Sequence, residues 1–442
     1  MVLKLALLSI FAAACSASLF DQHSGSSGGG GDDDGSGSGS GMALSSCPAP
    51  CLADGGSDFG VSGTGFRYLE DTRDRKWTPM MLSGTTEVGT MDAMNKIDSC
   101  ANDSSAPACA QLPDALLVSS SGSGSVADPA IEWTSTSNQI VAIELGAFVP
   151  SSGAPQTIRL YRNAREDALV TVEAMPGTRA DGSIVLDALA GDRFLVAVAP
   201  VAAGTADVGL QFFASQGAGT FPQQCQLALQ MSSVSGNTMP NQCGSMFTGM
   251  TDDADDTGST PSPITLGSSA FPEMGSAATF TENHFMVGAD IIDRSADTTT
   301  QFWLQQGTIP DTYGSWVFSD YDLNNGGGLG FDVYENSAST GLALDVGTCT
   351  DPNSNPLGFA IATSTYPMDS AWHFIRAVHS NGMLNICIDG KMTASVAIPM
   401  GGLKTTFPPY DGQNGQWLPL GAFMNGSIDD IRSFKTALPC GS

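Results

Sequence analysis

The chain has 442 residues, of which 41% are hydrophobic, so it is long enough for two or three domains with buried cores. It carries 45 acidic residues against 17 lysines and arginines, which gives a net charge of −28. A surface this negative repels phosphate backbones and anionic headgroups, which argues against nucleic acid as a partner.

Residues 1–18 are typical of an export signal. The stretch MVLKLALLSIFAAACSAS has one lysine and then about ten apolar residues, too few to cross a bilayer as a helix. Residues 12–15 (AAAC) resemble the lipobox of bacterial lipoproteins, although an alanine stands where a leucine is usual. The resemblance implies lipidation of Cys15; the alternative is plain secretion after cleavage near Ala17.

Residues 19–44 form a Gly-, Ser- and Asp-rich segment that can build no core and is expected to be a flexible tether. Behind a lipidated cysteine, such a tether would lift a folded body off a membrane. We therefore expect an exported protein, either a lipoprotein of the outer membrane or cell surface, or a secreted one. Contact with a membrane is expected only through the lipid anchor.

Disulfide bonds are the default expectation for the later cysteines, because an exported chain meets oxidising conditions. No C-x-x-C pair is present to suggest a zinc site. The odd count implies a free thiol or an intermolecular bond, and the spacing leaves the pairing open. The disulfide candidates are Cys47, Cys51, Cys100, Cys109, Cys225, Cys243, Cys349, Cys387 and Cys440.

Residues 45–216 predict a β-sandwich, because short alternating runs recur between glycines and prolines. A loose resemblance of AGDRFLVAV to jelly-roll accessory modules of extracellular bacterial proteins supports this. Residues 65–81 carry alternating charges, which we interpret as a strand or loop with internal ion pairs rather than a binding patch. The expected strands are 130–135, 139–148, 157–163, 169–175, 183–189, 192–200 and 208–214. Residues 217–224 are expected to be a linker.

Residues 225–442 carry four segments in a characteristic order: GSAATF, TQFWLQ, WHFIRAVHSNGMLNICIDGKMTASV and NGSIDDIRSFKTAL. Their series resembles the laminin-G-like, concanavalin A-type jelly roll. The resemblance implies an all-β chain that ends in such a jelly roll and binds a glycan or an extracellular protein.

Two turn signals, at residues 381–382 (NG) and 389–390 (DG), predict a three-stranded meander with type I′ turns. Its register places Ala377 opposite Ile386 and Ile375 opposite Ile388. The other face is expected to hold Phe374, Val378, Cys387, Met392 and Ala394. Two-sided apolar character predicts that this outer face is partly covered.

The laminin-G-like resemblance also implies cysteine pairs. The segment CQLALQM (225–231) fits the family's opening strand, which lies beside the closing one. Cys225 or Cys243 would then bond to Cys440. Cys349 and Cys387 would form a cross-strand pair.

A calcium site is the expected cofactor chemistry. Asp320, Asp322 and Asn324 stand at alternate positions before a glycine run, and hard oxygen ligands on a tight loop suit Ca²⁺. Laminin-G-like modules often bind calcium at a loop rim. The alternative is a glycine-rich hairpin with exposed acids.

A ligand surface is expected in the segment PPYDGQNGQW (408–417), where aromatic and amide side chains suit stacking on a sugar or gripping a peptide. The alternative is that these aromatic rings pack beneath their own loop. The candidate binding residues are Tyr410, Asp411, Asn414 and Trp417.

Catalysis is not expected. A retaining glycosidase needs two carboxylates about 5–5.5 Å apart, and the chain has no run of acids at alternate strand positions of the Glu-x-Asp-x-x-Glu kind. Asp429 and Asp430 are adjacent, so they leave opposite faces of a strand, and we expect them to hydrogen-bond to loop backbone. His373 and His379 lie too far apart on their strand, roughly 20 Å, to share a metal. Both are interpreted as structural.

The sequence therefore predicts a non-catalytic surface protein that binds a glycan or a protein. Two other hypotheses remain open: a divergent polysaccharide-cleaving enzyme, and a purely structural envelope lipoprotein.

Overall fold

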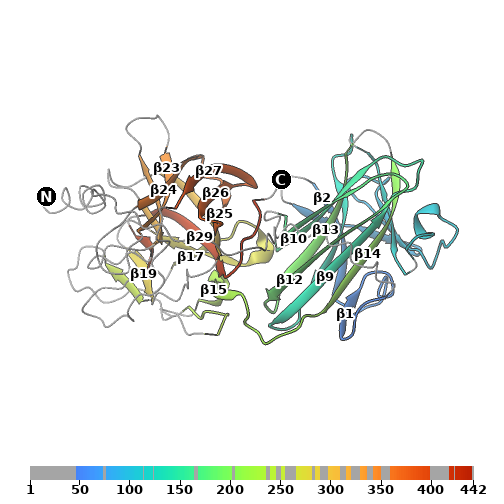
Figure 1. Ribbon diagram of the computed structural model, residues 1–442, viewed down its shortest axis with the longest axis horizontal. Helices are drawn as coiled ribbons and strands as arrows, with labels where there is room; N and C mark the ends of the chain where they lie inside the picture. Colours follow the sequence, from blue (N-terminus) through green and yellow to red (C-terminus); the bar gives the residue numbers. More distant parts are fainter. Residues whose placement is uncertain are drawn as a thin grey trace, which may run out of the picture. The chain divides into compact units, whose positions relative to one another are not determined.

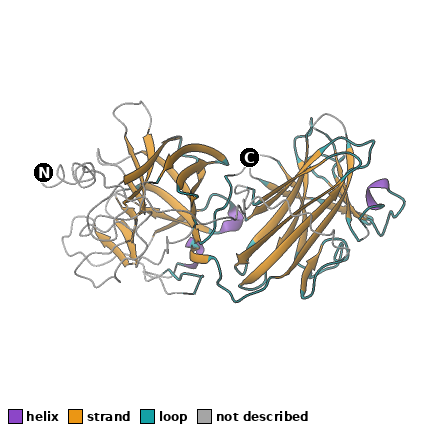
Figure 2. Ribbon diagram, in the orientation of Figure 1, coloured by secondary structure: helices purple, strands orange, loops and turns teal. Residues whose placement is uncertain are grey.

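The structure is a computed structural model that describes residues 46–440. The exceptions are 73–75, 113, 123, 164–167, 202–204, 235–238, 245–249, 254–264, 281–283, 289–296, 309–314, 320–328, 336–341, 350–358, 399–417 and 423. The described chain is built of strands with three one-turn 3₁₀ segments, as Figure 2 shows. Within it, no helix has the length and apolar character needed to cross a bilayer. The chain divides into two compact units between Gln223 and Gln224.

The N-terminal unit contains two antiparallel sheets (Figure 1). The first runs β12-β9-β14-β7-β6-β5-β4, with β1 also paired to β14, and the second runs β11-β10-β13-β8-β2-β3. Their strands are β1 (Cys51–Asp54), β2 (Phe66–Asp71), β3 (Trp77–Pro79), β4 (Met81–Ser83), β5 (Thr86–Val88), β6 (Lys96–Ser99), β7 (Leu116–Ser120), β8 (Asp128–Thr134), β9 (Gln139–Phe148), β10 (Gln156–Arg162), β11 (Val170–Ala174), β12 (Arg179–Ala188), β13 (Arg193–Pro200) and β14 (Ala206–Gln216).

The core of this unit lies between the two sheets. Phe66 of β2 meets Phe212 of β14 edge to face, with ring centroids 5.7 Å apart, so these two side chains mark the inner faces. Beside them, Trp133 and Phe194 oppose each other on β8 and β13 and stack at 5.6 Å. The predicted β-sandwich is confirmed for this part of the chain.

Two buried carboxylates bind donors from other segments of this unit. Glu132 on β8 pairs with Arg67 at 3.1 Å and also with Arg193, so the partner of Arg67 lies outside the segment 65–81 for which internal ion pairs were expected. Glu70 on β2 accepts the backbone N–H groups of Met91 and Asp92 at 2.6 and 3.0 Å. Because a buried carboxylate needs such donors, Glu70 fixes the loop between β5 and β6 against β2.

A short cap covers part of the outer face of the first sheet. The 3₁₀ segment η1 (Pro107–Cys109) lies in a loop closed by the Cys100–Cys109 disulfide. A Cβ at Gly209 would stand 2.3 Å from the carbonyl oxygen of Ala108. Only glycine therefore lets the cap approach β14 this closely.

The C-terminal unit also contains two antiparallel sheets (Figure 1). The first runs β17-β18-β29-β20-β25-β26-β27, with β15 paired to β29, and the second runs β16-β19-β28-β21-β22-β23-β24. Their strands are β15 (Cys225–Leu229), β16 (Met250–Asp253), β17 (Thr265–Ser268), β18 (Ser276–Phe280), β19 (His284–Gly288), β20 (Thr298–Thr308), β21 (Ser315–Ser319), β22 (Leu329–Glu335), β23 (Leu342–Cys349), β24 (Phe359–Tyr366), β25 (Trp372–Ser380), β26 (Met383–Ile388), β27 (Lys391–Ala397), β28 (Leu418–Ala422) and β29 (Asn425–Phe434). The remaining 3₁₀ segments are η2 (Met231–Ser233) and η3 (Pro272–Met274).

Apolar side chains of the first sheet form the core of this unit. Phe302 and Leu304 of β20, Ile375 of β25 and Ile428 of β29 are fully buried in one cluster. Alternation along each strand gives these residues a common face. Strand β29 is central, because β15, β18 and β20 all pair with it.

The predicted meander is confirmed in strands β25 to β27. Asn381 and Asp389, each followed by glycine, have φ angles of 52° and 51°, as type I′ turns require. Ile375 pairs with Ile388, and Ala377 with Ile386, as expected.

The expected face of Ala394 is wrong. The register shifts between Ile386 and Cys387, so Cys387 opposes Met392 whereas Ile386 opposes Ala394. The extra residue, Thr393, turns Ala394 inward against the core, while Met392 stays exposed.

Candidate functional site

A buried histidine joins two loops at the rim of the first C-terminal sheet. His373 Nδ1 lies 2.6 Å from Asp389 Oδ2, and His373 Nε2 lies 3.0 Å from Asp369 Oδ1. Burial, the largest influence, opposes the imidazolium, but the hydrogen bonds and charges of the two carboxylates together raise the pKa of His373. Asp389 also accepts the backbone N–H of Phe374 at 3.0 Å. The cluster therefore ties the β26–β27 turn and the loop before β25 to one strand, which agrees with the structural interpretation of His373.

The loop before β25 is further anchored to β20. Gln305 donates through its side-chain amide to the carbonyl of Ser370 at 2.9 Å. A Cβ at Gly307 would lie 1.9 Å from the Ser370 hydroxyl oxygen, so the glycine permits this approach. The rim is thus a preformed edge rather than a free loop.

The outer face of the same sheet is covered, as its two-sided apolar character predicted. Trp303 is fully buried between Phe271 and Phe374, with ring centroids 5.2 and 5.0 Å away. Arg376 donates to Gln301 at 3.1 Å and to the carbonyl of Pro439. We call residues 435–440, which cross this face, the C-terminal strap.

The strap is fixed by both hydrogen bonds and a covalent bond. The Thr299 hydroxyl donates to the carbonyl of Thr436 at 2.7 Å and accepts the N–H of Leu438 at 2.9 Å. A disulfide links Cys387 of β26 to Cys440. The strap therefore covers the part of this face around Thr299, Arg376 and Cys387.

Asp429 and Asp430 serve different structural roles. Asp430 has a φ of 46° and accepts from Arg432 at 2.9 Å, within a strand whose register shifts at this point. Asp429 is buried, accepts the Ser269 hydroxyl, and accepts the N–H of Asp430 at 2.8 Å. Burial and the neighbouring charge of Asp430 raise the pKa of Asp429 to about 7, against the opposing bond from Ser269.

The cysteine pairs differ from those that the family resemblance implied. Cys225 bonds to Cys243 and Cys440 bonds to Cys387, so neither Cys225 nor Cys243 pairs with Cys440, and Cys387 does not pair with Cys349. The reason is that the strap passes over β26, which brings Cys440 to Cys387. The other two disulfides are Cys47–Cys51 and Cys100–Cys109.

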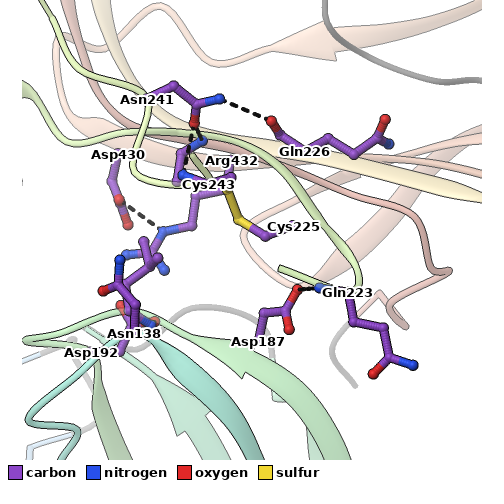
Figure 3. The surroundings of a disulfide bond; sticks show 12 residues. Asn138, Asp187, Asp192, Gln223, Cys225, Gln226, Asn241, Cys243, Asp430 and Arg432 are labelled. Carbon is purple, nitrogen blue, oxygen red and sulfur yellow. Dashed lines mark hydrogen bonds and ion pairs between the residues drawn. A yellow bond between two sulfur atoms is a disulfide. The ribbon is translucent and has the colours of Figure 1, made fainter. Parts of the chain in front are cut away.

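Figure 3 shows why Cys243 reaches Cys225. The side chain of Asn241 donates to the carbonyl of Gln226 at 3.1 Å and accepts the N–H of Ala228 at 2.9 Å. It also accepts the N–H of Cys243 at 3.1 Å. The buried side-chain amide of Asn241 therefore aligns residues 241–243 with β15.

The predicted ligand residues lie outside the described parts of the chain. This holds for the calcium candidates Asp320, Asp322 and Asn324, for the surface candidates Tyr410, Asp411, Asn414 and Trp417, and for Cys15. Strands β21 and β22 come directly before and after residues 320–328, which contain the calcium candidates and are called the calcium segment below. The two strands pair antiparallel, with Ser319 opposite Gly330. The segment therefore connects two neighbouring strands. Among the described residues, no group of three or more His, Cys, Asp or Glu side chains is placed to hold a metal ion.

Residues 279–439 match the family described as the concanavalin A-like lectin/glucanases superfamily. No curated protein matches the chain.

Three solved structures illustrate the structural similarity. Domain 4 of the extracellular GH43 arabinanase AbnA of Geobacillus stearothermophilus, in complex with arabinotriose, is 14% identical with a TM-score of 0.34, over 49% of this chain and 95% of that one. The binding domain of botulinum neurotoxin DC in complex with SialylT is 14% identical with a TM-score of 0.33, and this chain covers about half of it (49% of each chain). The CBM22 tandem domain of Paenibacillus barcinonensis Xyn10C is 11% identical with a TM-score of 0.24, over 89% of this chain and 100% of that one.

The family match falls on the unit that the segment order pointed to, and its strands pair as two antiparallel sheets with the last strand beside the first. The C-terminal part of this chain contains a domain of the concanavalin A-like lectin/glucanases superfamily.

Proposed function

We propose that the protein is a non-catalytic, surface-located glycan-binding protein whose C-terminal domain contacts the glycan. The observation that carries the proposal is the match of residues 279–439 to a superfamily named for lectins and glucanases. A protein ligand is the second candidate for the same domain.

The use of carboxylates supports binding over cleavage. Glycoside hydrolysis needs one carboxyl group as acid and another as nucleophile or base, both facing the scissile bond. In the described C-terminal domain, Asp369 and Asp389 bind His373, while Asp429 binds Ser269. These acids are engaged in holding loops and strands, and the sequence offers no run of acids at alternate positions to replace them.

The site is proposed to lie on the segments that carry the sequence candidates. The outer face of the first sheet is occupied by the C-terminal strap, which leaves loops and the second sheet for a ligand. Tyr410 and Trp417 would stack on sugar rings and Asn414 would hydrogen-bond to hydroxyl groups. Calcium held by Asp320, Asp322 and Asn324 would order a neighbouring loop.

The four disulfides support an oxidising location, because such bonds form and persist outside the cytosol. With the export signal, they favour a protein that acts at the cell surface or beyond it. Attachment through a lipid on Cys15 is part of the proposal.

A glycan array tests the proposal. The full chain, folded with its disulfides, is applied with calcium and with chelator, and binding to a defined glycan class is expected. The variant Tyr410→Ala/Trp417→Ala should lose that binding, whereas Phe407→Ala, an aromatic residue that immediately precedes the segment and that the proposal does not use, should keep it. Release of reducing sugar from a polysaccharide would overturn the non-catalytic role. Absence of array binding together with capture of one extracellular protein would replace the glycan by a protein ligand.

A further inference from the structure

The N-terminal unit contains a pocket that none of the roles above uses. It has a volume of about 310 Å³ and lies where the margins of the two sheets meet. Its lining includes Phe66 and Tyr68 of β2, Glu87 of β5, Val61 and Met80. We call it the seam pocket.

Glu87 occupies a position that belongs to the core side of its sheet. It pairs with Ile97, which in turn pairs with Val118, and both of these apolar residues are fully buried. Residues directly opposite each other share a face, so the carboxylate points toward the seam between the sheets. Burial raises the pKa of Glu87. The side chain of Glu87 has no hydrogen bond or ion pair to the described residues.

The lining also contains aromatic rings, and a second carboxylate, that of Asp58, adds to the negative charge near Tyr68. Tyr68 packs against Phe59 with ring centroids 5.0 Å apart, and its phenol oxygen feels the negative charges of Glu87 and Asp58. Burial, the largest influence, raises the pKa of Tyr68 to about 12; the Gly60 backbone N–H opposes this rise and the two carboxylates add to it. The phenol therefore stays neutral at physiological pH.

The basic residue of the lining does not neutralise the pocket. Arg67 reaches out of β2 to Glu132, at 3.1 Å, and its side chain is 54% exposed. Neighbouring residues of a strand face opposite sides of its sheet, so Arg67 projects from the face of β2 opposite Phe66 and Tyr68, where Glu132 binds both Arg67 and Arg193. The charge of Glu87 is thus left for a ligand.

The lining selects one class of ligand. A partly desolvated carboxylate beside aromatic rings attracts a cation, and Val61, Pro79 and Met80 offer apolar contact to a hydrocarbon stem. An anion would be repelled, and a neutral sugar would leave the carboxylate uncompensated. The stem would leave the pocket past Leu82, which opposes Glu87 on β4 and is 64% exposed.

We propose that the seam pocket binds an alkylammonium group, the chemistry shared by free aliphatic amines and the lysine side chain, with Glu87 as its counter-ion. This site is independent of the glycan role of the C-terminal domain.

The experiment follows methionine methyl signals of the full chain by NMR during titration with n-butylammonium, and separately with n-butanol. The signal of Met80, identified by its loss in Met80→Leu, should move in a saturable way with the amine. The signal of Met239, buried in the C-terminal domain, should not move. Affinity for the amine should exceed that for the alcohol about tenfold, because the two differ chiefly in charge.

Two variants separate charge from fold. Glu87→Gln should abolish the preference for the amine, whereas Glu173→Gln, an exposed glutamate of the same unit bonded to Thr157, should keep it. A parallel titration with N-acetyl-lysine-N-methylamide distinguishes a free amine from a lysine side chain as the ligand. Tighter binding of n-butylammonium indicates a free amine, and tighter binding of the lysine derivative indicates a polypeptide. Equal affinity of wild type for amine and alcohol, or no saturable shift of Met80, would overturn the proposal even if Glu87→Gln failed to fold.

Discussion

His373 and Asp389 form a 2.6 Å contact that joins the start of β25 to the turn after β26. Because the pKa of His373 is raised on folding, the folded domain binds a proton more tightly than the unfolded chain. The stabilisation is fully present below the unfolded value of about 6.5 and is lost as the pH rises through the folded value.

We predict that His373→Gln lowers the free energy of unfolding of the C-terminal domain by roughly 1.5–3 kcal/mol at about pH 5.5 and by less at about pH 8.5. Urea titrations at both pH values measure this difference. Asp389→Asn keeps an acceptor for the N–H of Phe374 but removes the charge, so it should flatten the pH dependence. If His373→Gln lowers the free energy of unfolding equally at both pH values, the contact between His373 and Asp389 is not linked to protonation of the histidine.

Asp429 predicts a pH effect in a different window. Its pKa rises from 3.8 to about 7 on folding, so the folded state holds an extra proton between these values. Stability contributed by the protonated acid is present below about 4 and falls as the pH approaches 7. Asp429→Asn should therefore make the unfolding free energy of the C-terminal domain less dependent on pH, and at neutral pH it should raise that free energy by on the order of 1 kcal/mol or more. Asp207→Asn serves as the control, because this exposed acid is also bonded to a serine; its pH profile should match that of wild type.

Removal of the Cys387–Cys440 bond should free the C-terminal strap. The bond spans 53 residues, whereas Cys47–Cys51 spans four. Since closing a longer loop restricts the unfolded chain more, Cys387→Ser/Cys440→Ser should cost about 2–4 kcal/mol. The matched pair Cys47→Ser/Cys51→Ser should leave the C-terminal transition in differential scanning calorimetry unchanged. Equal effects of the two double variants on that transition would argue against a structural role for the strap.

Gly209→Ala should destabilise the N-terminal unit by about 1–3 kcal/mol, because the added methyl meets the carbonyl oxygen of Ala108 under the disulfide-closed cap. Gly124→Ala is the control, since a Cβ there has no neighbour within 4 Å. Thermal unfolding of both variants checks the difference. A Gly209→Ala protein as stable as the control would show that the cap yields easily.

The calcium segment predicts a metal-dependent stability. If Asp320, Asp322 and Asn324 hold Ca²⁺, chelator should lower the melting temperature of the C-terminal domain, and Asp320→Ala/Asp322→Ala should abolish that response. Asp297→Ala, an acid outside the segment, should retain it. Isothermal titration of chelated protein with calcium gives the stoichiometry, and absence of heat in wild type would remove the site.

Much of the fold was predictable from local pattern. Strand β9 begins and ends as expected at Gln139 and Phe148, and the turns after Ser380 and Ile388 form as their NG and DG pairs predict. Strong alternation and φ-permissive turn residues are local properties, so a sequence carries them directly.

Strands β1 and β5 to β7 were not predicted, and residues 65–81, which contain β2 and β3, were expected only as a strand or loop, for an equally physical reason. Strand β4 is three exposed residues, Met81–Ser83, and β5 is three half-buried ones, Thr86–Val88. Segments this short show no periodicity, and their pairing is set by anchors such as Glu70, which acts across more than 20 residues of chain.

In the candidate site too, contacts between residues distant in the chain could not be predicted from local sequence pattern. The sequence predicts a structural role for His373 but neither of its partners, Asp389 and Asp369, although Asp369 stands four residues before the histidine. The pairing of Cys387 with Cys440 depends on the path of the strap, which cysteine spacing does not encode. Glu87 belongs to no sequence motif, and only its pairing with Ile97 across β5 and β6 shows that its carboxylate lies on the core side of the sheet.

The pairing of Cys225 with Phe434 across β15 and β29 sets the order in which the C-terminal domain can be assembled. A ribosome delivers the first partner some two hundred residues before the second, so the sheet cannot close while the chain is still short. Until Cys440 is synthesised, Cys387 has no native disulfide partner, whereas Cys349 has already been synthesised and could form a non-native disulfide with it. Correct maturation thus favours a compartment that supplies an isomerase as well as an oxidant.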